Sequence, residues 1–79
     1  MTIAYVLISC DLGFDAEIIE EMKHLSDVKE AHGILGAYDI IAKVESDSVE
    51  HLRDVITWKI RKLNRVRSTL TLIVAEKNS

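Results

Sequence analysis

Hydrophobic residues recur in this chain at a spacing of 38 positions, although the two halves share few identical residues elsewhere. Each half has the pattern of a strand, an amphipathic helix and a second strand, which predicts two βαβ units in tandem. We therefore expect an α+β, ferredoxin-like βαββαβ domain, an αβ-sandwich whose four-stranded antiparallel sheet carries two helices on one face. Such a domain fills all 79 residues, so one domain, 1–79, is expected. The matched positions are Ile3 with Ile41, Val6 with Val44, Ile18 with Ile56, Met22 with Ile60, Leu25 with Leu63, and Val28 with Val66.

Hydrophobic periodicity and turn residues predict the individual elements. Asp15 is expected to cap the first helix, and a serine in the segment 46–48 is expected to cap the second. Gly36-Ala37 is the expected turn between the second and third strands. The expected strands are 3–10, 28–35, 38–45 and 67–75, and the expected helices are 16–25 and 48–63.

The two helices can cover one side of such a sheet, so the other side should alternate cleanly between apolar and polar residues if water covers it. The first strand does not alternate, because Ile3, Tyr5 and Leu7 would lie opposite an equally apolar face. The chain is also 48% hydrophobic, a large share for a chain with so high a ratio of surface to volume. Scattered surface hydrophobes would be the ordinary explanation, but neighbouring strands share the excess, which favours a homodimer formed through the sheet face.

Charge and cysteine content exclude several classes of protein. A net charge of −3 argues against a general nucleic-acid-binding protein, whose surface would be basic. One cysteine, Cys10, cannot form an intramolecular disulfide. Residues 3–10 are too few to span a membrane and lack the flanks of a signal peptide, so we expect a cytoplasmic protein.

Neither a metal nor a cofactor is expected. His24, His32 and His51 have a spacing that matches no metal-ligand motif. Trp58 lies off the apolar stripe of the second helix, where it either anchors a contact between subunits or packs at the edge of the core. Basic residues, Arg61 among them, gather at the end of that helix, where the helix dipole favours cations. A contact with a phosphate or an acidic partner is the alternative for this cluster.

The segment Gly36–Asp39 has the most specific combination of residues for a binding site. A glycine lets the backbone approach a ligand closely, and the carboxylate three residues later can hold an ammonium group by charge-assisted hydrogen bonds. The same residues also suit an ordinary hairpin turn with a solvated aspartate. Thr69 and Thr71 share one face of the last strand and can bind a small polar ligand, although threonine is also simply a good strand residue.

These segments resemble the effector-binding domain of the Lrp/AsnC family. The segment 36–44, GAYDIIAKV, is similar to the family's glycine–x–tyrosine–aspartate hairpin. The segment 63–71, LNRVRSTLT, is similar to its closing helix–turn–strand with threonine-x-threonine. YVLI at 5–8 matches the opening strand and LSDV at 25–28 the end of the first helix, so the resemblance covers essentially the whole chain.

The chain departs from the family pattern at two places. Asn64-Arg65 stands where the family usually has a Pro-Gly-like turn, and Asn64 is expected to take the left-handed conformation there. The first strand begins at Ile3, whereas full-length members carry a helix-turn-helix before this domain. The resemblance is therefore to a stand-alone form, for which direct DNA binding is not expected.

The resemblance implies a domain that dimerises through its sheet, assembles further into octamers or other rings, and binds amino acids between neighbouring dimers. Asp39 would take the α-ammonium group of the effector, and backbone amides near Gly36 its carboxylate. The residues that would line this cleft are Leu35, Gly36, Ala37, Tyr38 and Asp39, with His32, Thr69 and Thr71 as further candidates.

The first functional expectation is a non-enzymatic amino-acid sensor linked to transcription regulation. It would act by changing its own assembly or by joining full-length Lrp/AsnC regulators in mixed oligomers. A purely structural assembly module without a ligand is the first alternative. A cofactor-free, monooxygenase-type enzyme is the second, and it requires a deep pocket between sheet and helices with a histidine or an acid inside, a role for His32 if it points inward. ACT-type domains share the fold but usually bind ligands at side-by-side sheet interfaces.

Overall fold

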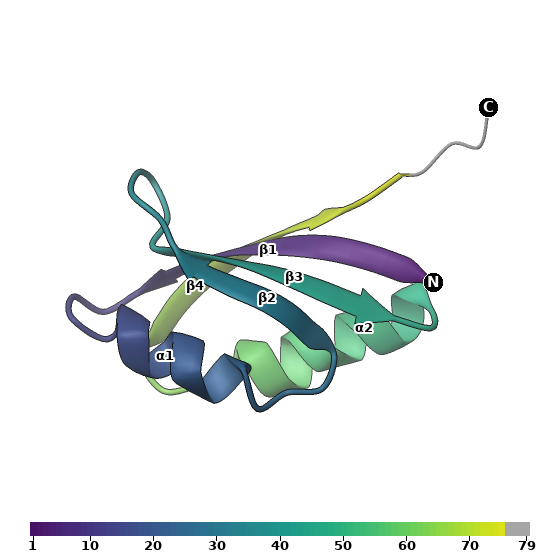
Figure 1. The fold of residues 1–79 in the computed structure, drawn as a ribbon, viewed down its shortest axis with the longest axis horizontal. Helices are drawn as coiled ribbons and strands as arrows, with labels where there is room; N and C mark the ends of the chain where they lie inside the picture. The colour runs from purple at the N-terminus through teal and green to yellow at the C-terminus, as the bar shows by residue number, and fades with distance from the viewer. Residues whose placement is uncertain (76–79) are drawn as a thin grey trace.

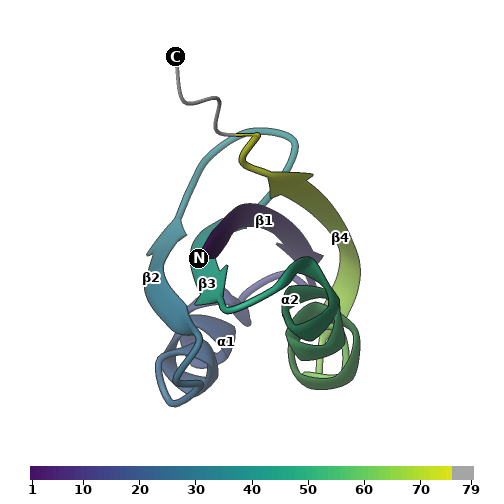
Figure 2. The same cartoon turned by 90° about the vertical axis from the view of Figure 1, so that its right-hand side faces the viewer.

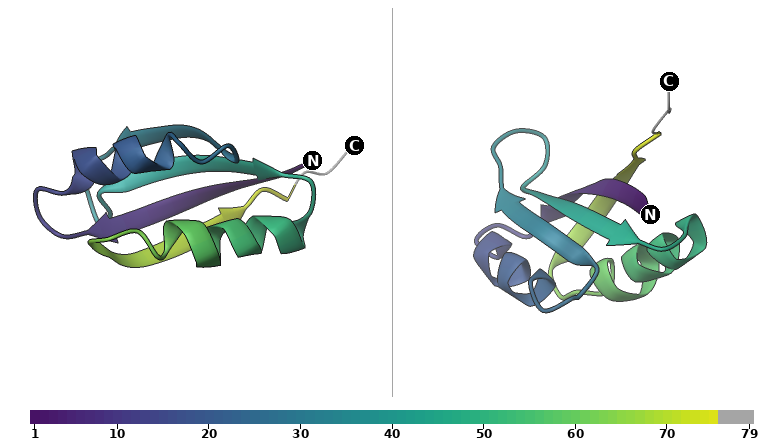
Figure 3. Two further views of the ribbon diagram at one scale, coloured as in Figure 1. Left: turned by 90° about the horizontal axis from the view of Figure 1, so that it is seen from below. Right: turned by 45° about the vertical axis from the view of Figure 1, so that its right-hand side comes forward.

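The computed structural model describes residues 1–75 and contains the two predicted βαβ units. All neighbouring strands are antiparallel, in the order β2-β3-β1-β4 (Figure 1). Both helices lie on the same face of the sheet, α1 under the β2 edge and α2 under the β4 edge (Figures 2 and 3). The predicted ferredoxin-like fold is confirmed. The elements are β1 (Thr2–Cys10), α1 (Asp15–Met22), β2 (Val28–Gly33), β3 (Ile40–Ser46), α2 (Val49–Val55), the π-helical turn η1 (Ile56–Ile60) and β4 (Val66–Ile73).

The core lies between the sheet and the helices. Alternate residues of β1 and β3 point into it, because side chains along a strand alternate between the two faces. Matched positions of the 38-residue repeat have matched environments: Val6 and Val44 are both buried in the core, as are Met22 and Ile60. The largest fully buried side chains are Ile8, Ile18, Met22, Ile40, Leu52, Ile60, Val6, Val44 and Val55.

The prediction for the start of the first helix is wrong, and that for the second is confirmed. Phe14, not Asp15, precedes α1, and it provides no side-chain cap. The reason is a turn in which the Phe14 N–H donates to the Asp11 carbonyl at 3.1 Å, so that the helix begins one residue early. Asp15 then lies in the first helical turn, where its charge suits the helix dipole. At α2, the Ser48 hydroxyl oxygen accepts the N–H of His51 at 3.1 Å.

The second helix differs from a continuous α-helix over 48–63. After Val55 the chain widens into η1, where the N–H of Arg61 donates to the carbonyl of Ile56, five residues back, at 2.9 Å. In an ordinary α-helix, residues four positions apart drift by about 40° around the helix axis. The wider turn reduces that drift, so Leu52, Ile56 and Ile60 all face the sheet.

The turn before β4 is also different from the sequence expectation. Arg65, not Asn64, has a positive φ, of 75°. Its carbonyl accepts the N–H of Asp11 at 2.9 Å, and its guanidinium lies 4.6 Å from the centre of the Phe14 ring. These contacts to the start of α1 hold the residue in a conformation that a non-glycine side chain otherwise disfavours.

Candidate functional site

The β2–β3 loop is longer than the two-residue turn predicted from the sequence. β2 ends at Gly33 and β3 begins at Ile40, and the N–H of Ile34 donates to the carbonyl of Asp39 at 2.9 Å to close the loop. Gly36 has a φ of 140°, which favours glycine, so this residue permits the path of the loop. The loop projects on the side of the sheet away from the helices (Figures 1 and 2).

The predicted hairpin residues differ in how far they are available to a ligand. Leu35, Gly36 and Ala37 are exposed at the tip, whereas Tyr38 and Asp39 are half-buried at its base. Leu35 has its whole side chain in water, an unusual environment for a large apolar residue. The tip is thus free for contact with a ligand or another subunit.

Asp39 ties this loop to the central strand. Its Oδ2 accepts the backbone N–H of Cys10 at 2.9 Å, and its own N–H donates to the carbonyl of Ile8 at 2.9 Å. Within residues 1–75, Oδ1 has no hydrogen-bond partner. Burial, with the negative charge of Asp39, raises the pKa of the Cys10 thiol, so that thiol is not an activated nucleophile. The carboxylate of Asp39 therefore accepts the backbone N–H of Cys10 through one oxygen and also interacts with the thiol of Cys10.

We expect Asp39→Ala to destabilise the domain by about 1–3 kcal/mol, because the buried N–H of Cys10 loses its acceptor. Asp39→Asn keeps an acceptor oxygen of the same shape and should cost clearly less. Urea unfolding followed by circular dichroism measures both free energies. Equal losses for the two variants would mean that the negative charge, and not the acceptor, is what stabilises the loop.

His32 lies on the open face of the sheet, the face without helices. It pairs with Ile41 across β2 and β3, and its Nε2 is 3.2 Å from Oε1 of Glu30. Both side chains are exposed. His32 thus shares a hairpin with residues 35–39 but does not point into the protein interior.

Thr69 and Thr71 lie on the opposite face of the sheet from His32. They pair with Ile8 and Val6, whose side chains belong to the core, so the two threonines face the helical layer. Within one protomer the structure therefore brings together His32 and 35–39 on one hairpin, and separates both threonines from them.

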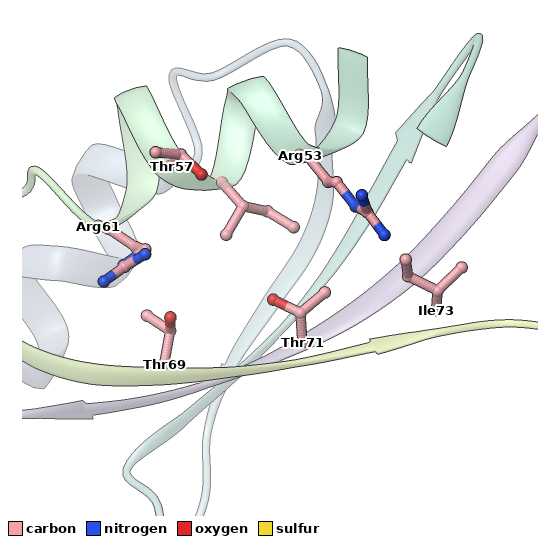
Figure 4. Close-up of a pocket in the computed structure, with 7 residues that line it drawn as sticks. Arg53, Thr57, Arg61, Thr69, Thr71 and Ile73 are labelled. Carbon is pink, nitrogen blue, oxygen red and sulfur yellow. The ribbon is translucent and has the colours of Figure 1, made fainter. Parts of the chain in front are cut away.

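The two threonines line an open hollow of about 480 Å³ between β4 and the second helix (Figure 4). Sequence reasoning missed its other polar residues, Arg53 and Thr57, and explained Arg61 by the helix dipole, with a phosphate or acidic-partner contact as the alternative. The sequence does carry a signal for this group, because Arg53, Thr57 and Arg61 recur at four-residue spacing. Each of them follows directly on a residue of the apolar stripe, which consists of Leu52, Ile56 and Ile60. The hollow is lined by Arg53, Ile56, Thr57, Arg61, Thr69, Thr71 and Ile73.

The open face of the sheet carries an apolar patch, which we call the open-face patch. Leu7 lies at its centre, paired with Ile41 on one side and Leu70 on the other. Tyr5, Leu70 and Leu72 are 38%, 43% and 50% exposed. The predicted apolar far side of the sheet is confirmed. The patch consists of Ile3, Tyr5, Leu7, Ile41, Leu70 and Leu72.

The remaining candidates are dispersed. Within residues 1–75 no three histidine, cysteine or acidic side chains converge as a metal site. Trp58 is 61% exposed, so it does not pack at the edge of the core, and the Lys62 ammonium lies 4.8 Å from its ring centre. Its role as an anchor between subunits stays a prediction.

Comparison with known proteins assigns the chain to a family. Residues 3–78 match the model of the Lrp/AsnC ligand binding domain. The chain belongs to the Lrp/AsnC family. The Escherichia coli AsnC structure superimposes with a TM-score of 0.89 at 27% identity, covering 96% of this chain and 52% of AsnC. A crystal structure from Thermus thermophilus gives a TM-score of 0.92 at 33% identity and covers 100% of this chain and 99% of that one.

Two curated relatives place this Lrp/AsnC domain in larger proteins. An uncharacterized HTH-type transcriptional regulator of Pyrococcus furiosus is 29% identical over 75 residues, covering 91% of this chain and 50% of the regulator. Homocitrate synthase of Saccharolobus islandicus is 33% identical over 75 residues, covering 94% of this chain. The chain spans 16% of that enzyme's length. Lrp/AsnC relatives thus include transcriptional regulators, and the similarity to the enzyme is confined to one part of it.

No helix within residues 1–75 is long and apolar enough to cross a membrane.

In the Lrp/AsnC pattern Arg65 occupies the left-handed position of the turn before β4, where the family usually has Pro-Gly. The turn survives this departure because the backbone and side chain of Arg65 both contact neighbouring elements.

Proposed function

We propose that this protein is a non-enzymatic oligomerisation module that responds to an amino acid and thereby acts in transcription regulation. The observation that carries the proposal is the open-face patch, which no element within residues 1–75 covers (Figure 2). An apolar surface that runs across three neighbouring strands is costly to leave in water. A second copy placed sheet to sheet would bury it in a symmetric homodimer.

The hairpin supports a further contact between dimers. Leu35 extends into solvent beyond the sheet, so it is suited to pack against another subunit. We propose that Leu35–Asp39 lines an effector cleft between neighbouring dimers of a ring, with His32 at its edge. Thr69 and Thr71 lie on the other face of the sheet in their own protomer, so we leave them out of this cleft.

The chemistry of the hairpin suits an α-amino acid. Oδ1 of Asp39 is available for the α-ammonium group, and exposed backbone amides near Gly36 are available for the carboxylate. If subunit contacts and ligand contacts share this cleft, ligand binding shifts the assembly equilibrium. The same coupling would operate in mixed assemblies with full-length Lrp/AsnC regulators.

An enzyme of the monooxygenase type is less well supported. It requires a histidine or an acid inside a pocket between sheet and helices, and the histidine named for that role, His32, is exposed on the open face. Domains of this kind form half of a regulator and a minor part of homocitrate synthase. A domain found in proteins with such different named roles is better explained by regulation than by a reaction of its own.

We expect the molar mass in solution, measured by light scattering, to be a multiple of the 8.9 kDa protomer and to change with one of the common amino acids at millimolar concentration. Asp39→Asn keeps the acceptor for Cys10 but removes the charge for the ammonium group, so the response should be lost while the basal assembly remains. Arg67→Gln, on an exposed residue away from the hairpin, is the matched control and should respond normally.

An assembly whose mass is indifferent to every amino acid would leave a purely structural module. A monomer would contradict the proposal altogether. Dimers joined through sheet edges, without burial of the open-face patch, would favour an ACT-like arrangement, and cross-linking between copies would distinguish the two.

A further inference from the structure

Arg53 and Arg61 form a pair of cations that the proposed amino-acid cleft does not use. They lie in the hollow beside the helix-facing side of β4, separated by the sheet from the open-face patch. Within residues 1–75 neither guanidinium forms an ion pair. Both guanidinium groups are therefore available to an anionic ligand.

The π-helical turn places these cations on one side of the helix. Eight residues of a regular α-helix advance about 80° beyond two full turns, which would carry Arg61 away from Arg53. The wider turn of η1 reduces that advance, so Arg53, Thr57 and Arg61 all line the same hollow. Figure 4 shows Arg61 at the end near Thr69 and Arg53 at the end near Ile73. π-helical turns are frequent at functional sites.

The lining has a definite chemical character. Its ends are cationic, its walls carry the hydroxyl groups of Thr57, Thr69 and Thr71, and its apolar contacts come from Ile56 and Ile73. The lining residues include no acidic side chain. An ammonium group would therefore meet two arginines and no carboxylate, so the hollow disfavours the amino acids that suit the hairpin.

The spacing of the cations indicates how the ligand's charges are arranged. Eight residues of helix separate the Cα atoms of Arg53 and Arg61 by about 12 Å, and Figure 4 shows the two side chains at opposite ends of the hollow. This arrangement suits two anionic groups better than one. The apolar contacts between them suit a short aliphatic spacer. The volume of about 480 Å³ lies within the usual range for small-molecule sites.

We propose that this hollow binds a small organic dianion, a dicarboxylate with an aliphatic spacer, as a second ligand distinct from the amino acid. Each carboxylate would accept hydrogen bonds from one guanidinium and from neighbouring threonine hydroxyls. The residues that would hold both carboxylates belong to one protomer, so we expect a monomer to bind the dianion.

The test is a calorimetric titration with adipate, and with hexanoate as a monocarboxylate of the same chain length. We expect adipate to bind at least about tenfold more tightly, since it engages both arginines. Arg53→Gln and Arg61→Gln should each weaken adipate binding about tenfold or more, while Arg67→Gln, outside the hollow, should leave it unchanged. All three residues are exposed, so these variants should fold.

Equal affinities for adipate and hexanoate, or an equal loss in Arg67→Gln, would overturn the proposal, as would the absence of adipate binding. Inorganic phosphate tests whether a compact dianion suffices, and binding as tight as that of adipate would contradict the two-ended arrangement. Leu7 lies at the centre of the open-face patch, so Leu7→Lys is expected to prevent dimerisation. Repeating the adipate titration on this variant separates the site from the amino-acid response. Adipate binding should persist there, although an effector cleft between dimers would be absent.

Discussion

Replacing Leu7 with lysine is expected to reduce the assembly to monomers of 8.9 kDa. Leu7 lies at the centre of the open-face patch, between Ile41 and Leu70. In a sheet-to-sheet dimer the new ammonium group would be buried without a partner, at a cost of several kcal/mol, and the symmetric copy would bury a second one. In the monomer the same side chain reaches water, so the fold itself should be retained. Light scattering or sedimentation measures the mass.

Leu12→Lys is the matched control for this prediction. Leu12 is fully exposed in the loop between β1 and α1, away from the open face, so the same substitution should leave the mass unchanged. Circular dichroism of both variants should match the wild type. If Leu7→Lys kept the wild-type mass, the open-face patch would not be the interface, and the proposed assembly would have to form through another surface.

Leu52→Ala is expected to lower the free energy of unfolding by about 3 kcal/mol, because the cavity that it leaves is not refilled. The Leu52 side chain is completely buried between α2 and the sheet, and truncation removes its apolar contacts. Domains of this size are stable by only about 4–12 kcal/mol, so a large share of that margin would be lost. Urea unfolding should be measured in the Leu7→Lys background, because dimerisation otherwise adds to the apparent stability.

The matched control is Leu12→Ala, in which the same atoms are removed from a fully exposed position. Its expected effect is within about 0.5 kcal/mol. A loss below about 1 kcal/mol for Leu52→Ala would indicate that α2 is not packed on the sheet as the structure places it.

Most of the fold could be predicted because the hydrophobic residues that form the core recur at regular spacings along the sequence. Val6 with Val44 and Met22 with Ile60 repeat the same burial 38 positions apart, and burial of apolar surface dominates folding. Element ends were less accurate, since they depend on single hydrogen bonds. The hydrogen bond from the Phe14 N–H to the Asp11 carbonyl places the start of α1 one residue earlier than predicted. The hydrogen bond from the Arg61 N–H to the Ile56 carbonyl closes a π-helical turn, which the hydrophobic pattern does not predict.

The candidate site was less predictable than the fold. The hairpin 35–39 could be chosen from its glycine and its aspartate, but the tie between Asp39 and Cys10 joins residues 29 positions apart and is invisible in local sequence. Thr69 and Thr71 were grouped with the hairpin by family resemblance. Strand register decides otherwise within one protomer, because it places them opposite Ile8 and Val6, on the helical face.

The sequence by itself determined the two βαβ units, the apolar open face and the family, because all three depend on the order and periodicity of residue types along the chain. The tertiary structure alone decided which polar residues meet. Arg53, Thr57 and Arg61 line one hollow with Thr69 and Thr71 because a π turn sets the helix phase and strand pairing sets the face. Contacts of this kind depend on the rotation of residues around the helix axis and on the register between strands. Both are set by many residues together, so the conformational preference of each residue taken alone does not predict them.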